Sequence, residues 1–77
     1  MESVFEDMRK LIIYNLDTIS KLVSTAEQMR KEVDTSQDKK LKTGLLKQID
    51  NMEKSIQQLV EHTVKLFNTY KQIVRGN

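Results

Sequence analysis

Apolar side chains in the first half of the chain recur at alternating intervals of three and four residues. This spacing keeps them on one side of an α-helix, and its persistence is the a/d pattern of a coiled coil. Asn15 fills the one vacant slot. The period of two that marks a strand is absent, so the pattern predicts a long amphipathic helix. Its apolar series is Phe5, Met8, Ile12, Ile19, Leu22, Ala26, Met29 and Val33.

The second half of the chain repeats the same period, with Thr63 in its single polar slot. It predicts a second amphipathic helix whose apolar series is Leu45, Ile49, Met52, Ile56, Leu59, Leu66, Tyr70 and Ile73. A further row widens each stripe by one position on the same side, to more than a two-stranded seam needs. This row consists of Leu16, Val23, Leu46, Val60, Phe67 and Val74.

A polar segment with good capping residues interrupts the pattern between the two stripes. Thr35 followed by Asp38 resembles a capping box, with Asp in place of the usual Glu or Gln. We therefore expect helix 1 over about residues 3–33, a turn at about 34–37 and helix 2 over about 38–75. Gly44 would then lie inside helix 2, at a cost of about 1 kcal/mol relative to Ala. In the alternative, the turn runs to residue 43 and Thr43 caps helix 2.

One continuous helix is the structural rival, and the heptads argue against it. If the first stripe continued in frame, Lys40 and Lys47 would occupy its next core positions. The sequence therefore predicts an all-α protein with one domain, a two-helix antiparallel hairpin resembling a coiled coil.

Composition narrows the ways in which so small a hairpin can be stabilised. The 77 residues include no Cys, no Pro and two Gly, and the net charge is only +2. A chain of this size has a thin core of its own, which disulfides, metals or association commonly reinforce. Thiol chemistry is excluded, and a single His cannot build a His-based metal site. We expect the hairpin to dimerise into a four-helix bundle, or to bind a helical partner protein.

Six apolar residues are expected to carry the association seam: Ile12, Ile19, Leu22, Ile56, Leu59 and Leu66.

Three polar residues fall at one level of the expected hairpin, where Asn15 faces His62 and Thr63. We interpret them as a candidate polar layer that fixes register, as a lone buried Asn does in coiled coils; a hydrated edge is the alternative. Ile13, Tyr14 and Val64 lie off the stripes and form a candidate outer face for a partner. The alternative is that single exposed apolar residues are ordinary.

Candidate chemistry is sparse. His62 is the only imidazole, and no nucleophile and acid accompany it in the spacing of a catalytic triad, so we expect no enzyme, no cofactor and no metal site. A basic group near the turn could contact phosphates, which makes nucleic-acid binding the alternative function. A solvated turn is the simpler interpretation. The group consists of Lys39, Lys40, Lys42 and Lys47.

No stretch approaches the length of a membrane span. Residues 1–7 are acidic and lack the features of a signal peptide, which predicts a cytoplasmic protein. The expected function is therefore a small non-catalytic regulator, adaptor or chaperone-like protein that works through the apolar faces of its helices.

Overall fold

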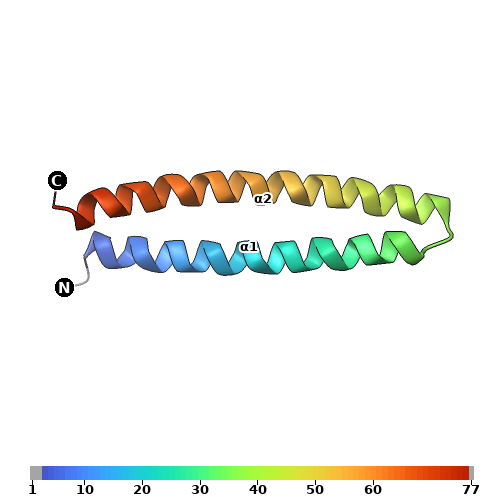
Figure 1. The fold of residues 1–77 in the computed structure, drawn as a ribbon, viewed down its shortest axis with the longest axis horizontal. Helices are drawn as coiled ribbons and strands as arrows, with labels where there is room; N and C mark the ends of the chain where they lie inside the picture. Colours follow the sequence, from blue (N-terminus) through green and yellow to red (C-terminus); the bar gives the residue numbers. More distant parts are fainter. Residues whose placement is uncertain (1–2, 77) are drawn as a thin grey trace.

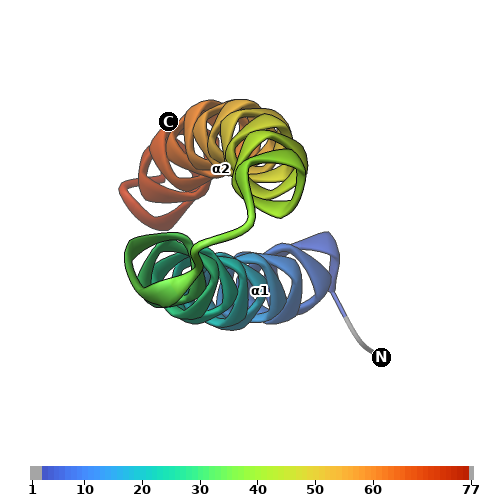
Figure 2. The same ribbon diagram turned by 90° about the vertical axis from the view of Figure 1, so that its right-hand side faces the viewer.

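The computed structural model describes residues 3–76 and consists of two helices, α1 (Val4–Thr35) and α2 (Lys39–Val74). They run antiparallel along an elongated body of 57 × 18 × 14 Å, with the turn at one end (Figure 1). Seen end-on, the helices wrap around each other (Figure 2). Supercoiling of this kind keeps an apolar stripe of period 3.5 at the contact between two helices. The predicted helical hairpin is confirmed.

Each helix begins at a side-chain cap. The Ser3 hydroxyl accepts a hydrogen bond from the backbone N–H of Glu6 at 3.2 Å, and two acidic residues follow in the first turn of α1. The Asp38 carboxylate accepts from the N–H groups of Lys40 and Leu41, at 2.9 and 3.3 Å. Caps of this kind satisfy N–H groups that have no partner inside the helix.

The connection between the helices is shorter than expected, because α1 continues to Thr35 and α2 begins at Lys39. The predicted capping role of Thr35 is wrong: its hydroxyl donates to carbonyl oxygens of its own helix, at 3.1 and 3.2 Å. Thr43, the alternative cap, also bonds inside its helix, to the Lys39 carbonyl. Asp38 caps α2 because its carboxylate directly precedes the first free N–H groups.

The far end of α2 stops at a glycine. Gly76 has a φ of +77° and donates its N–H to the Ile73 carbonyl at 3.0 Å. A residue without a Cβ adopts this left-handed conformation at little cost, which ends the helix.

The interior is a single seam between the two apolar stripes. Its fully buried apolar residues are Ile12, Ala26 and Ile49, of which Ile49 is only 2% exposed. At the open end, the Phe5 and Tyr70 rings lie 4.7 Å apart between centroids. The other expected seam residues are half-buried, namely Ile19, Leu22, Ile56, Leu59 and Leu66.

Ile73 departs from the predicted seam, because it is 41% exposed. The Phe5–Tyr70 contact already lies in the first turn of α1. One turn beyond Tyr70, little of α1 remains for Ile73 to pack against.

We predict that Gly44→Ala stabilises the hairpin. Gly44 lies inside α2, and a Cβ added there would meet no heavy atom within 4 Å. Alanine should raise the free energy of unfolding by about 0.5–1 kcal/mol, because it lowers the conformational entropy of the unfolded chain. Thermal unfolding followed by circular dichroism should show a Tm higher by about 2–8 °C.

Gly76→Ala is the matched control, because its Cβ also meets open space but the backbone there has a positive φ. It should not raise the Tm. A lower Tm for Gly44→Ala would mean that α2 does not continue through this position.

Candidate functional site

One side of the hairpin exposes a continuous row of apolar side chains beside the seam, here called the open face. Leu16 and Val23 lie seven residues apart on α1. Val60 and Phe67 lie seven residues apart on α2, with Val64 beside them. A spacing of seven residues returns to the same side of a supercoiled helix. These five side chains are between 38% and 54% exposed. Four of them belong to the widened stripe of the sequence, whose other members, Leu46 and Val74, are also exposed. Val64 was expected off that stripe.

The open face is hollowed at two places. The first hollow, of about 250 Å³, is lined by apolar side chains apart from Thr63. Its floor belongs to the seam and its walls to the open face. The lining residues are Ile12, Leu16, Ile19, Val60, Thr63, Val64 and Phe67.

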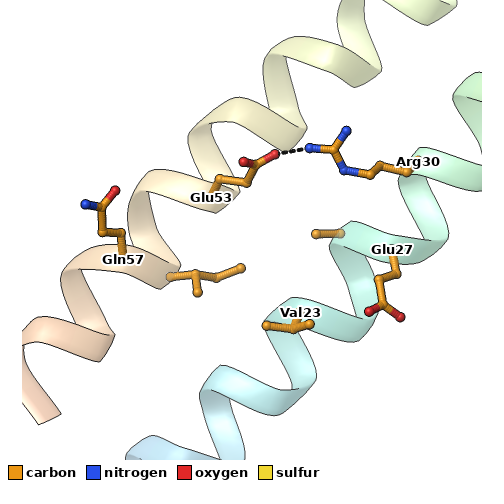
Figure 3. A pocket seen from close by; sticks show the side chains of 7 residues that line it. Val23, Glu27, Arg30, Glu53 and Gln57 are labelled. Atoms are coloured by element: carbon orange, nitrogen blue, oxygen red, sulfur yellow. Dashed lines mark hydrogen bonds and ion pairs between the residues drawn. The ribbon is translucent and has the colours of Figure 1, made fainter. Parts of the chain in front are cut away.

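The second hollow lies nearer the turn and measures about 410 Å³. Its apolar lining includes Ala26, whose single methyl group fills little of the space between the helices. Arg30 and Glu53 form an ion pair across it from opposite helices, and Glu27 and Gln57 complete a polar rim (Figure 3). Both partners of this pair are more than half exposed, so the pair contributes little stability.

The other side of the hairpin is more polar. A hollow of about 320 Å³ there is lined by Leu22, Gln48, Asn51, Met52 and Ser55. Leu11 and Leu41 are exposed outside the open face, but they lie near opposite ends of the hairpin. A continuous apolar row is therefore a property of the open face, and the hairpin is amphipathic as a whole.

The predicted outer face is only partly one surface. Ile13, Tyr14 and Val64 are all exposed. Val64 lines the first hollow, and Ile13 lies one turn before Leu16 at the edge of the open face. Tyr14 is about 100° further round α1, away from that edge. The sequence assigned Val60 and Phe67 only to a widened stripe, although their seven-residue spacing was the signal for this surface.

Two of the three residues of the predicted polar layer are buried. Asn15 and Thr63 are each 5% exposed, whereas His62 lies on the surface, so its expected place in the layer is wrong. His62 precedes Thr63 by one residue, and that rotation carries it out of the seam. The Thr63 hydroxyl donates to the Leu59 carbonyl of its own helix at 2.7 Å. Within residues 3–76, no buried side-chain N or O lacks a hydrogen-bond partner.

The predicted basic group is divided between different sides of α2. Lys40 and Lys47 are seven residues apart and exposed, on a row away from the seam. Lys42 is half-buried and lies seven residues before the core residue Ile49, on the seam side; Lys39 belongs to neither row. The four lysines therefore do not converge on one patch.

Neither metal-binding nor membrane-spanning features occur in the described part of the chain. Residues 3–76 gather no group of three His, Cys, Asp or Glu side chains that could hold a metal ion. Over the same residues, neither helix combines the length and the apolar character needed to cross a bilayer.

We predict that Thr63→Val stabilises the hairpin. The change removes a buried hydroxyl that donates to the Leu59 carbonyl, a backbone group of the same helix, α2. Valine should raise the free energy of unfolding by about 0.5–1 kcal/mol, because no buried hydroxyl then has to be desolvated. Urea unfolding followed by circular dichroism measures the change.

Thr69→Val is the matched control, since the Thr69 hydroxyl makes the same bond to Lys65 at an exposed position. This control should change the stability much less. A loss of stability in Thr63→Val alone would mean that the hydroxyl contributes more to the seam than its helix bond accounts for.

Comparison with known proteins adds no relative from which a function could be transferred. No protein-family model, no curated protein and no solved structure matches this chain.

Proposed function

We propose that this hairpin is a non-catalytic protein–protein interaction module that binds a helical partner through its open face. The observation that carries the proposal is the one-sided apolar row of Leu16, Val23, Val60, Val64 and Phe67. Contiguous exposed apolar surface of this kind commonly marks a protein interface. The partner is either a second copy, completing a four-helix bundle, or another helical protein, with the hairpin acting as an adaptor, regulator or chaperone-like subunit.

The magnitude of the apolar contribution supports binding. Complete burial of a Val, Leu or Phe side chain is worth about 1.5–3 kcal/mol. Each open-face side chain is roughly half exposed, so covering the remainder contributes about 1 kcal/mol per residue. Five such residues supply about 5 kcal/mol before the entropic cost of association is subtracted.

The shape of the open face also suits a helix. Two hollows follow one another along the body, both bounded by α1 on one side and α2 on the other. Side chains on a partner helix recur every three or four residues and would fill such hollows, as ridges fill grooves between packed helices. The charged rim at Glu27, Arg30 and Glu53 would remain wet around this apolar centre.

A carboxylate introduced into the seam should unfold the hairpin, whereas one introduced on the open face should weaken partner binding only. In Ile49→Asp the carboxylate would enter the most buried position of the hairpin, and we expect the helical circular dichroism signal to be lost. In Val64→Asp the carboxylate would be half exposed, so we expect helicity to be retained and binding to weaken at least about fivefold, in line with losing about 1 kcal/mol of apolar contact.

Binding is measured with a photo-crosslinking residue placed at position 64, in cells expressing the chain. Crosslinks to protein should form from this position and be lost when Val60→Asp is added. The same residue at position 65, outside the open face, is the control. Equal loss of helicity in Ile49→Asp and Val64→Asp would contradict the division between seam and open face.

A further inference from the structure

We infer that the occupant of the open face is a second copy of this chain, related by a two-fold axis that lays α1 antiparallel on the α1 of the other copy. The inference rests on the proposed function, because it uses the same surface. It adds the identity of the partner and its orientation, and both follow from the order of side chains along α1.

The side of α1 that faces outward at the open face carries the same charge motif near both ends. Glu6 and Arg9 occupy one end, and Glu27 and Arg30 repeat the Glu-x-x-Arg motif three heptads later. Glu27 and Arg30 line the second hollow directly. Glu6 and Arg9 lie three heptads earlier in the same two rows, and they form an ion pair of 3.4 Å with each other. The residues between the motifs in these rows are Ile13, Leu16, Ser20 and Val23.

This strip is complementary to itself when it is turned end for end. With the axis midway between Leu16 and Ser20, Glu6 faces Arg30 of the second copy and Arg9 faces its Glu27. Ile13 then faces Val23 of the second copy. Each of these four charges meets an opposite charge, with Arg30 also paired to Glu53 of its own chain. Nearest the axis, Leu16 faces Ser20 of the second copy. Self-complementarity of this kind is what an interface between identical subunits related by a two-fold axis requires.

The parallel orientation lacks this match. If the two turns lay together, α1 would face α2 of the second copy at the same level. Val23 and Glu53 line the same hollow, where Glu53 already pairs with Arg30 of its own chain, so this orientation brings the apolar Val23 of one copy beside that ion pair of the other. One turn nearer the connection, Glu27 would face Asp50, and two carboxylates would oppose each other. Like charges across an interface disfavour that arrangement.

The antiparallel orientation also fills the larger hollow. Phe67 is the largest side chain of the open face and lies toward the free ends of the helices, whereas the hollow beside Ala26 lies toward the turn. When one copy is turned end for end, Phe67 of each copy lies over the hollow beside Ala26 of the other copy. An aromatic side chain entering a hollow at a small residue is a common centre for an interface.

The surface area agrees with association. The hairpin exposes 6262 Å². A compact monomer of its mass, 9.0 kDa, exposes about 4,900 Å². The excess of about 1,400 Å² exceeds the roughly 800 Å² that each partner contributes to a standard interface. Apolar contact therefore drives the dimer, and the exposed ion pairs at its ends choose the orientation.

Charge reversal tests the orientation. In Arg9→Glu, the new carboxylate at position 9 faces Glu27 of the second copy, at both ends of the dimer. In Glu27→Arg, the new guanidinium group at position 27 faces Arg9 of the second copy at the same two places. Sedimentation equilibrium of the purified chain at low salt should show a wild-type dimer. Each single change should raise the dissociation constant at least about tenfold, because each affected pair occurs twice. The double variant Arg9→Glu/Glu27→Arg should return to within about threefold of the wild type, since opposite charges again meet.

Lys65→Glu is the matched control for Arg9→Glu, because it changes the net charge by the same amount at a position on α2 outside the open face. It should leave the dissociation constant unchanged, with helicity monitored in every variant by circular dichroism. A dimer that responds equally to Arg9→Glu and Lys65→Glu, or a double variant that fails to recover, overturns the antiparallel orientation.

Cysteine crosslinking provides an independent readout, because the chain has no native Cys. The variant Ile13→Cys/Val23→Cys should form a covalent dimer under mild oxidation, and Tyr14→Cys/Val23→Cys should not. A wild-type chain that remains monomeric at all concentrations overturns the second copy as the partner. In that case, crosslinks from position 64 to a different protein would leave the proposed function standing, and a lack of any such crosslink would overturn it as well.

Discussion

Packing of two apolar stripes against each other along one seam stabilises this hairpin and positions every other feature. Neither helix can bury its stripe alone, and isolated helices of this kind derive most of their stability from tertiary contacts. The seam is narrow, with Ile12, Ala26 and Ile49 as its fully buried apolar residues. The short connection at Ser36–Asp38 keeps the two stripes in register by reversing the chain immediately.

The width of the stripes connects this packing to function. Two helices need two positions per heptad at their contact, and the chain supplies a third on one side. Because α1 and α2 run antiparallel, the third rows of both helices fall on the same side of the seam. Leu16 and Val23 thereby join Val60 and Phe67 on the open face, while the opposite side carries Gln48, Asn51 and Ser55.

Polar residues occur both within the seam and on the rim of the open face. Asn15 and Thr63 interrupt the seam, and the Thr63 hydroxyl bonds to its own helix instead of reaching across. The pair therefore leaves less apolar contact at that level of the seam. The exposed Arg30–Glu53 ion pair contributes little stability. In the dimer that we propose, the order of charges along the open face selects the orientation of the second copy.

The sequence by itself determined both helices, the polar segment that contains the turn, the seam residues from Phe5 to Tyr70 and the polar interruptions at Asn15 and Thr63. Periodicity is sufficient for these features because it states which residues share one side of a helix. The 100° step per residue also separates His62 from Thr63 and Tyr14 from Ile13. Only the tertiary structure decided where hollows form between the two helices, and that Ile73 has little to pack against. Those outcomes depend on how the two helices are rotated and where they overlap. A period within one helix carries no information on either quantity, because both are set by contacts between the helices.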